Sequence, residues 1–121
     1  MLFDSLDFKA MESSLAANWT KQQVIAQNLA NVDTPGYKAR EVSFENVLDR
    51  KMLDSKDNRY AFQTTITQQQ DTYINPDGNN VDVDKESMDL YDSYIQSAYL
   101  VQKMNAVFSN YRYVLTQSSF K

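Results

Sequence analysis

The sequence predicts a mostly α-helical protein in which two long terminal helices pair as a coiled coil and an irregular polar arm joins them. Only two glycines and two prolines occur in 121 residues, far below their combined usage of about 12 % in average proteins. Apolar residues recur at alternating three- and four-residue spacing near both chain ends. We therefore expect one structural unit with a helix in 1–34, a turn and polar arm in 35–84, and a second helix in 85–121.

The first helix is predicted from a heptad-like line of positions, here called the N-terminal seam. The seam comprises Phe8, Met11, Leu15, Asn18, Gln22, Ile25, Leu29 and Val32. Its ends are apolar and its middle is amide, so Asn18 and Gln22 are expected to fix the helix register at some cost in stability. The flanking positions Ala16, Trp19, Ala26 and Ala30 are mostly small, which favours close approach of a neighbouring helix.

The end of this helix is predicted from the dipeptide Pro35-Gly36. Proline disfavours the α conformation at the preceding Thr34. Pro-Gly suits the two central positions of a type II turn, in which the glycine adopts positive φ. A helix of about 25 residues is therefore expected to stop here, and the chain to turn sharply away.

The second helix has the cleaner pattern, with spacing of four and three over nearly four heptads. This C-terminal seam comprises Leu90, Tyr94, Ser97, Val101, Met104, Phe108, Tyr111 and Leu115. Asp82 and Asp84 predict its start, because acidic residues in a first turn complement the helix dipole. A second stripe widens the apolar face in the first half and consists of Met88, Tyr91, Ile95 and Ala98. That half is expected to contact two neighbours at once.

The polar arm lacks helical periodicity from residue 54 to 84. Ahead of it, residues 43–53 are candidates for a short helix with Ser43 as the N-cap. Residues 62–67 and 71–74 are candidate strands, so the arm has room for a small β-hairpin. Residues 75–79 contain Asn-Pro-Asp-Gly-Asn and are predicted to form a turn.

The composition argues against an enzyme, a metal site and a nucleic-acid partner. Cysteine and histidine are both absent, which removes the commonest nucleophiles, general bases and metal ligands. The net charge is −4 and the pI about 4.7, without a basic cluster that could follow phosphates. The loop around Gly78 fails as an EF-hand, because Tyr73 stands at the first ligand position. We expect no cofactor and no small-molecule substrate.

Two further expectations concern the chain end and the use of the seams. The first residues lack a basic region followed by an apolar run, so we expect no ordinary signal peptide, and no stretch approaches the ~18 apolar residues of a membrane span. The seams have two readings. In the plain one, an antiparallel hairpin buries one seam on the other. In the second, the seams also face other subunits, as the polar seam positions and the excess of aromatic residues near the C-terminus suggest.

The stretch NLANVDTPGY at residues 28–37 resembles the N-terminal signature of bacterial flagellar axial proteins, the rod, hook and hook-associated family. Within that family the chain is most similar to basal-body rod proteins, both in the continuation at residues 38–44 and in residues 78–86. The matching signature positions are Asn28, Leu29, Ala30, Asn31, Asp33, Thr34, Pro35, Gly36 and Tyr37. The resemblance covers about half the chain; residues 54–72 and the tail 118–121 show no family pattern.

The resemblance implies a structural rod subunit without catalytic residues. Such a subunit would leave the cytoplasm through the flagellar type III export system, assemble helically in the periplasm with other copies of itself and other rod proteins, and meet adaptor proteins of the membrane ring and export gate at the rod base. Torque would pass through packed helices. The positions expected at its assembly interface are Met11, Leu15, Asn18, Gln22, Ile25, Leu29, Leu90, Tyr94, Val101, Met104, Phe108, Tyr111 and Leu115.

Two other classes of protein stay open from the residues alone. A helical-hairpin adaptor or export chaperone would share the seams, lack the signature, and form a stable dimer in dilute solution. A carboxylate-based enzyme would require a concave site with a shifted pKa, for which the polar arm offers no evident candidate.

Overall fold

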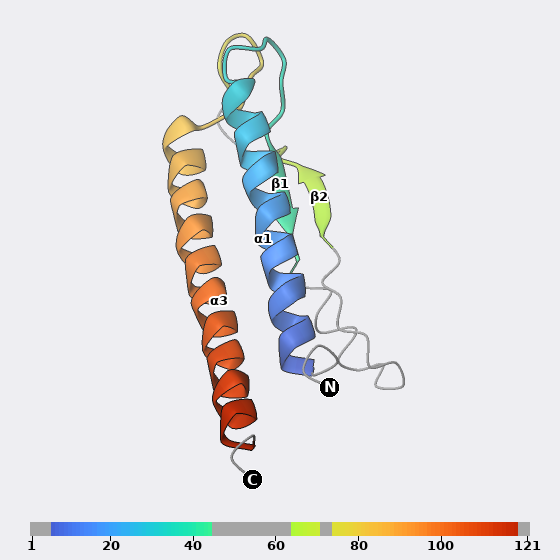
Figure 1. Ribbon diagram of the computed structural model, residues 1–121. Helices are drawn as coiled ribbons and strands as arrows, with labels where there is room; N and C mark the ends of the chain where they lie inside the picture. The colour runs from blue at the N-terminus through green and yellow to red at the C-terminus, as the bar shows by residue number, and fades with distance from the viewer. Residues whose placement is uncertain (1–5, 45–63, 71–73, 119–121) are drawn as a thin grey trace, which may run out of the picture.

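The protein is described by a computed structural model that covers residues 6–44, 64–70 and 74–118. Along the chain it contains helix α1 (Leu6–Ala30), strand β1 (Arg40–Ser43), strand β2 (Thr65–Gln68) and helix α3 (Val83–Ser118). The two helices lie side by side and antiparallel, and the two-stranded ribbon lies beside α1 (Figure 1). The predicted fold class, two long helices with a small β-element between them, is confirmed.

Helix α3 begins at the acidic cap that the sequence predicts. The Asp82 Oδ1 accepts hydrogen bonds from the backbone N–H groups of Asp84 and Lys85, at 3.1 and 3.2 Å. These bonds satisfy donors that have no partner inside the helix. At 36 residues α3 is longer than α1, which has 25. The Phe8 ring, near the start of α1, meets the Phe108 ring edge-on at 5.8 Å, so the last turns of α3 extend beyond α1 (Figure 1).

The arm forms a strand pair whose composition differs from the sequence prediction. The strand predicted at 62–67 is present as β2, but it pairs antiparallel with β1, with Arg40 opposite Gln68 and Ser43 opposite Thr65. Ser43 is the last residue of β1, and residues 45–53 of the predicted short helix lie outside the described residues, so its role as an N-cap stays a prediction. Residues 71–73 of the second candidate strand also lie outside the described residues. The pairing joins segments distant in sequence, which local patterns do not report.

The line of α3 that packs on α1 is rotated relative to the predicted seam. Leu90, Ser97 and Met104 are half-buried as seam positions should be, but the fully buried centre of the contact is Ser93, one residue before Tyr94. The packed line comprises Glu86, Leu90, Ser93, Ser97, Leu100, Met104 and Val107. The seam residues left exposed on α3 are Tyr94, Val101, Phe108, Tyr111 and Leu115, of which Phe108 also contacts Phe8. A small serine permits closer helix approach than a tyrosine would, which explains the rotation.

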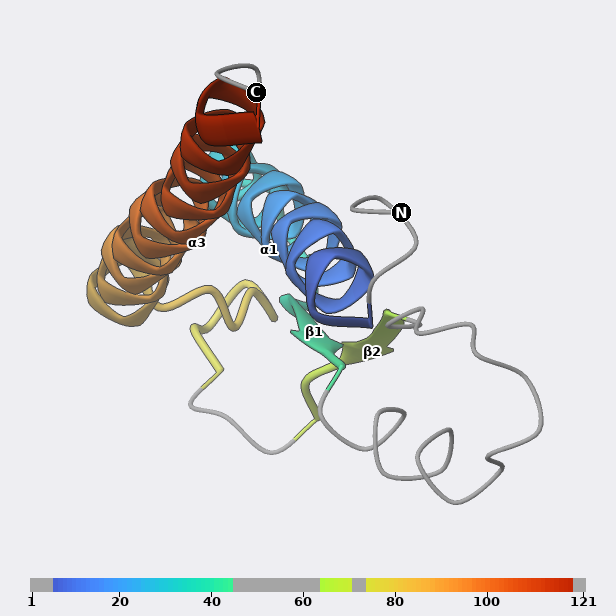
Figure 2. The same cartoon turned by 60° about the horizontal axis from the view of Figure 1, so that its bottom comes forward.

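The core of the described chain is small and half polar. Its buried apolar residues are Phe8, Ala17, Val24, Ile25, Ala39 and Val81. Its buried polar residues are Asn18, Asn28, Asn79, Asn80, Glu86 and Ser93. Among the described residues, every buried side-chain nitrogen and oxygen has a hydrogen-bond partner. Figure 2 shows the two helices with the β-ribbon beside α1. Four of the buried polar residues lie at a helix end or in the loop before α3: Asn28, Asn79, Asn80 and Glu86.

Candidate functional site: a loop junction and an apolar helix surface

The turn at the end of the signature is a type II turn, as predicted. The backbone N–H of Tyr37 donates to the carbonyl of Thr34 at 3.3 Å, which closes a four-residue turn. Gly36, at its third position, has φ of 72°. Positive φ at that position defines type II and strongly favours glycine, so the sequence explanation for Pro35-Gly36 is confirmed.

A second glycine loop meets this turn. The N–H of Gly78 donates to the Asn75 carbonyl at 2.8 Å, and Gly78 has φ of 86°. The Gly36 N–H donates to the Asp77 carbonyl at 2.9 Å, and a Cβ placed on Gly78 would lie 3.4 Å from the Gly36 Cα. The chain's only two glycines therefore lie against each other, each preceded within two residues by one of its two prolines. We call this contact, formed by residues 28–41 and 75–86, the loop junction.

Asn28 connects α1 to the first strand inside the loop junction. Its side chain is 0 % exposed. The amide nitrogen donates to the Arg40 carbonyl at 2.8 Å, and the amide oxygen accepts from the Arg40 N–H and the Tyr37 hydroxyl, both at 3.0 Å. The Asn28 amide thus pairs with both the backbone N–H and the backbone carbonyl of Arg40, as a residue of a neighbouring β-strand would. The first asparagine of the signature thus sets where the chain enters β1, and the signature tyrosine holds that asparagine in place.

Two consecutive asparagines hold the second loop against the first. Asn79 donates to the carbonyls of Asn31 and Thr34 at 2.8 and 2.9 Å, and its oxygen accepts from the Val81 N–H at 2.8 Å. The next residue, Asn80, accepts from the Ala39 N–H at 2.6 Å and donates to the Gln69 carbonyl at 2.9 Å. Together they connect α1, the type II turn, the end of β2 and the start of α3.

The remaining signature residues end α1. The Asn31 amide donates to the Gln27 carbonyl at 2.7 Å, and its oxygen accepts from the Thr34 hydroxyl at 3.0 Å. The Thr34 N–H donates to the Asn31 carbonyl at 3.0 Å. Leu29 is half-buried, whereas Ala30, Asp33 and Pro35 are exposed. The structure therefore brings most of the predicted signature together as a capping and loop-packing unit.

Glu86 is the one buried carboxylate described in the loop junction, with 3 % of its surface exposed. Loss of hydration raises the pKa of this carboxyl group, and nearby Asp89 and Glu41 add to that effect. A hydrogen bond with the Asn28 side chain and the charge of Lys85 act in the opposite direction and lower the pKa. Burial is the largest of these causes, so the pKa of Glu86 is raised above its ordinary value.

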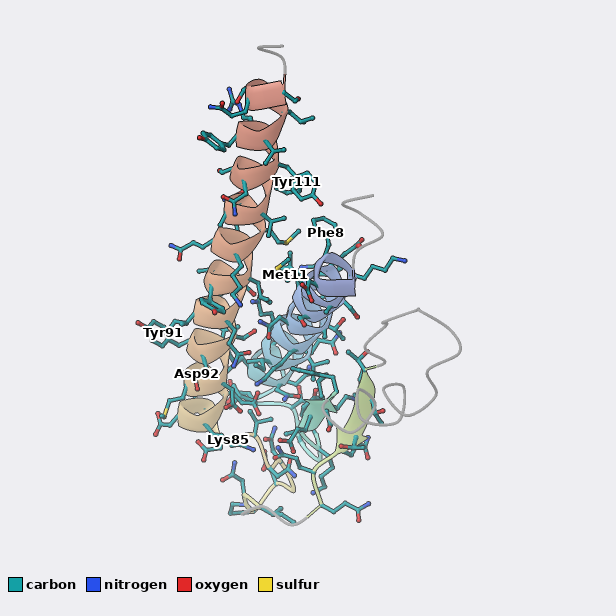
Figure 3. All side chains as sticks on the ribbon, turned by 90° about the horizontal axis from the view of Figure 1, so that it is seen from below. Phe8, Met11, Lys85, Tyr91, Asp92 and Tyr111 are labelled. Carbon is teal, nitrogen blue, oxygen red and sulfur yellow. The ribbon has the colours of Figure 1, made fainter. Side chains whose placement is uncertain are left out.

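Polar residues also form the middle of the contact between α1 and α3. Asn18 donates to the Ser93 carbonyl and to the Ser97 hydroxyl, both at 3.4 Å, and Gln22 donates to the same hydroxyl at 3.2 Å. The predicted polar seam positions of the two helices thus face each other. Near the start of α1, Phe8 and Met11 lie between the helices (Figure 3). The remaining N-terminal seam residues Leu15, Ile25 and Leu29 are at least half-buried.

The outer surface of α3 has a different character, because many of its large side chains are apolar and exposed. Tyr91 is 67 % exposed and points away from α1 (Figure 3). The exposed large apolar residues of α3 are Val83, Met88, Tyr91, Tyr94, Ile95, Tyr99, Val101, Phe108, Tyr111, Tyr113, Val114 and Leu115. A helix that is apolar on most sides is typically buried on most sides. We call this the α3 surface.

Sequence reasoning missed four buried polar residues: Asn79, Asn80, Glu86 and Ser93. A signal for the two asparagines was present, because they directly follow Pro-Asp-Gly, the chain's second proline and glycine in close succession. The Ser93 position could have been found from its small size between larger residues on the packed side. Glu86 gave no such signal, because an acidic residue in a first helical turn is usually exposed.

Fold and site together define a two-helix structural protein, with an internally satisfied loop junction and an exposed apolar outer helix. Across the described ranges no group of three metal-ligating side chains is close enough to hold a metal ion. Neither of the described helices has the length and apolar character required to cross a bilayer.

Comparison with known proteins identifies the family. The family model described as flagella basal body rod protein matches residues 9–38. The flagellar basal body rod protein FlgB of Bacillus subtilis (strain 168) is 38 % identical over 120 residues, covering 88 % of this chain and 90 % of that protein. The protein of the same name from Escherichia coli (strain K12) is 30 % identical over 115 residues, covering 78 % and 83 %. This chain therefore belongs to the FlgB family of flagellar basal body rod proteins.

Proposed function

We propose that this chain is built into the flagellar rod as a structural subunit and transmits motor torque through helices packed against its neighbours. The observation that carries the proposal is the α3 surface, on which aromatic and aliphatic side chains are exposed along the whole helix. Burying that surface is favourable by about 25 cal/mol per Å² of apolar area. Neighbouring subunits are the partners that would bury it.

The small polar core supports coupling of folding to assembly. A core with as many buried polar as buried apolar residues gains less from the hydrophobic effect than an apolar core of equal size. The isolated subunit is therefore expected to be only marginally stable, which suits a chain that is exported unfolded. Assembly then adds the burial that the single chain lacks.

The proposal also covers partners and location. We assign the neighbours as other copies of this chain and other rod proteins, with adaptor proteins of the membrane ring and export gate at the rod base. The chain would reach the periplasmic rod through the flagellar type III system. Its role is mechanical and includes no reaction and no cofactor.

The predicted interface residues divide into two groups under this proposal. The first group is buried or half-buried within the chain and comprises Met11, Leu15, Asn18, Gln22, Ile25, Leu29, Leu90 and Met104. The second group is exposed on α3, is available to neighbours, and comprises Tyr94, Val101, Phe108, Tyr111 and Leu115. We therefore assign the intersubunit contact mainly to α3, with 1–34 and 35–84 serving to position that helix.

The test is replacement of the chromosomal copy in the source bacterium. Deletion should abolish rods in electron micrographs of basal bodies and abolish swimming, and the wild-type chain should restore both. The chain should be present in purified basal bodies by mass spectrometry. Recovery of the chain as a stable soluble dimer, absent from basal bodies, would instead favour the adaptor or chaperone alternative.

A further inference from the structure

Helix α3 carries apolar residues on two sides in addition to the line that packs on α1. Ser93, at 0 % exposure, marks the side that faces α1. Because successive residues are about 100° apart around a helix, Tyr94 lies about 100° from that line and Tyr91 about 160° from it. Tyr94 and the adjacent Ile95 are likewise separated by about 100°. The α3 surface therefore has two parts, one on the side of Tyr94 and one on the side of Tyr91, opposite α1.

The side of α3 that carries Tyr94 continues onto α1. Asn18 and Ser93 are hydrogen-bonded and mark the facing lines of the two helices. Trp19 and Tyr94 each follow a facing residue by one position, and the same rotation on antiparallel helices brings both to the same side of the pair. Trp19 also lies about 140° around α1 from Val24, which lines a pocket with strand β1. Trp19 is thus on the side away from the ribbon.

This side, here called the two-helix surface, comprises Trp19, Ala26, Tyr94 and Val101. All four are exposed, Trp19 by 63 %. Ala26 is small and exposed, two turns beyond Trp19 toward the start of α3, so an additional helix can approach closely there. The other side, here called the back surface, comprises Met88, Tyr91 and Ile95, all exposed. It continues toward the C-terminus through exposed Gln102, Ala106 and Ser109. Tyr99 lies nearer the ribbon side, where it lines a pocket with Phe44 and has the Lys103 Nζ 5.3 Å from its ring centroid.

Charged residues of α3 avoid the back surface. Between Met88 and Ser109, the charged residues of α3 are Asp89, Asp92 and Lys103. These three fall within about 60° of one another around the helix, on the side toward the ribbon, where Asp89 lines the pocket with Val42. On the two-helix surface one carboxylate is present, because exposed Glu12 lies about 20° around α1 from Trp19. Depletion of charge and enrichment of tyrosine and tryptophan characterise the buried centres of protein interfaces, so the back surface suits an apolar protein partner.

We infer that the back surface of α3 in one copy packs into the two-helix surface of the next copy. The inference rests on the proposed function and specifies its contact. Each surface offers what the other requires: a single uncharged helical ridge on one side, and on the other a two-helix face that includes the small residue Ala26. Because the two surfaces are different patches, the contact is heterologous and leaves both ends open. Repetition of such a contact generates a helical filament, whereas a self-complementary patch would close as a dimer.

The absence of cysteine from the sequence makes this contact directly testable. Ala26→Cys marks the two-helix surface, and Ala98→Cys, Gln102→Cys and Ala106→Cys are a series along the back of α3; all four positions are exposed. The source bacterium, lacking its own copy, would express the Ala26→Cys chain together with one back variant. Purified basal bodies would be treated with a short bismaleimide. We expect an adduct of two copies for at least one pair in the series.

Controls separate this geometry from other contacts. Ala26→Cys expressed alone and each back variant expressed alone should give no adduct of two copies. Ala26→Cys paired with Asp92→Cys should also give no adduct, because Asp92 is an exposed position on the charged side of α3.

Four results would overturn the inference. An adduct with Ala26→Cys alone would indicate a symmetric contact, and an adduct of Ala26→Cys with a different rod protein would assign the surface to that partner. Basal bodies that contain the chain but yield no self-adduct across the series would exclude the proposed contact while leaving the rod function intact. Absence of the chain from basal bodies would reject the proposed function itself, and the contact with it.

Discussion

The loop junction and the α3 surface differ in chemistry and in burial: the loop junction is polar and buried, and the α3 surface is apolar and exposed. The loop junction buries Asn28, Asn79 and Asn80, and each of these amides is hydrogen-bonded within the chain. The α3 surface exposes Tyr91, Tyr94 and other large apolar groups along the helix. Folding of one chain satisfies the polar groups of the loop junction. Burial of the α3 surface requires neighbouring subunits.

The difference follows from the directionality of the two interactions. A buried amide without a partner costs about 1–3 kcal/mol, so polar groups must find correctly placed partners before they can be buried. Apolar burial is non-directional and scales with area, so an apolar surface can remain exposed in the single chain and be buried when a neighbour binds. We therefore expect substitutions in the loop junction to change stability, and substitutions on the α3 surface to change assembly.

The largest effect on stability is expected from Asn79→Ala. The substitution removes three hydrogen bonds, one of the two accepted by each of the Asn31 and Thr34 carbonyls and the one donated by the Val81 N–H. At about 1 kcal/mol for each hydrogen bond, the free energy of unfolding should fall by roughly 3 kcal/mol. Urea unfolding followed by circular dichroism measures it. Asn75→Ala is the matched control, because Asn75 contributes to the same loop through its backbone; equal losses for both variants would contradict the role of the Asn79 amide.

A smaller loss is expected at the paired glycines. Gly36→Ala and Gly78→Ala should each cost about 1–2 kcal/mol, because positive φ is unfavourable for a residue with a Cβ. Gly36→Val should cost more than Gly36→Ala, since a β-branched residue tolerates this region poorly. Thermal unfolding of the three variants gives the order. A Gly36→Val protein as stable as wild type would contradict the assignment of the type II turn. Normal swimming of cells that carry Gly36→Val would show that the turn is not required for assembly.

The pH dependence of stability is expected to be weaker still and to depend on Glu86. Burial raises the pKa of Glu86 in the folded state above its unfolded value, so the folded chain prefers the neutral carboxyl. This group adds no penalty below the unfolded pKa, and its penalty grows as pH rises through the folded pKa. Glu86→Gln should flatten that fall in stability. Urea midpoints measured across the acidic range test it, and a steeper fall in the variant would give the wrong sign.

The smallest change in stability, with a large change in assembly, is expected on the α3 surface. Tyr91→Ser removes an exposed ring that points away from α1, so the free energy of unfolding should stay within about 0.5 kcal/mol of wild type. Swimming and rod formation should nevertheless be lost. Asp92→Ser, one position further on the charged side, is the control and should swim normally. The opposite outcome, with a motile Tyr91→Ser and a non-motile Asp92→Ser, would move the interface to the charged side.

Local patterns in the sequence were sufficient for the helices, their ends and one turn. Heptad spacing placed α1 and α3, Asp82 marked the start of α3, and Pro35-Gly36 specified a type II turn. Each of these features depends on residues within a few positions of one another. The signature also indicated the family, which the relatives of known name then established.

Tertiary structure alone decided which distant residues became partners. The choice of Arg40–Ser43 as the partner of β2, the contact of Gly36 with Gly78, and the packing of Ser93 in place of Tyr94 all join segments far apart in the chain. A heptad pattern specifies an apolar stripe but not which edge of it faces a particular helix. That edge was selected by how closely the helices can approach and by the buried amides that had to be satisfied, and both are properties of the assembled fold.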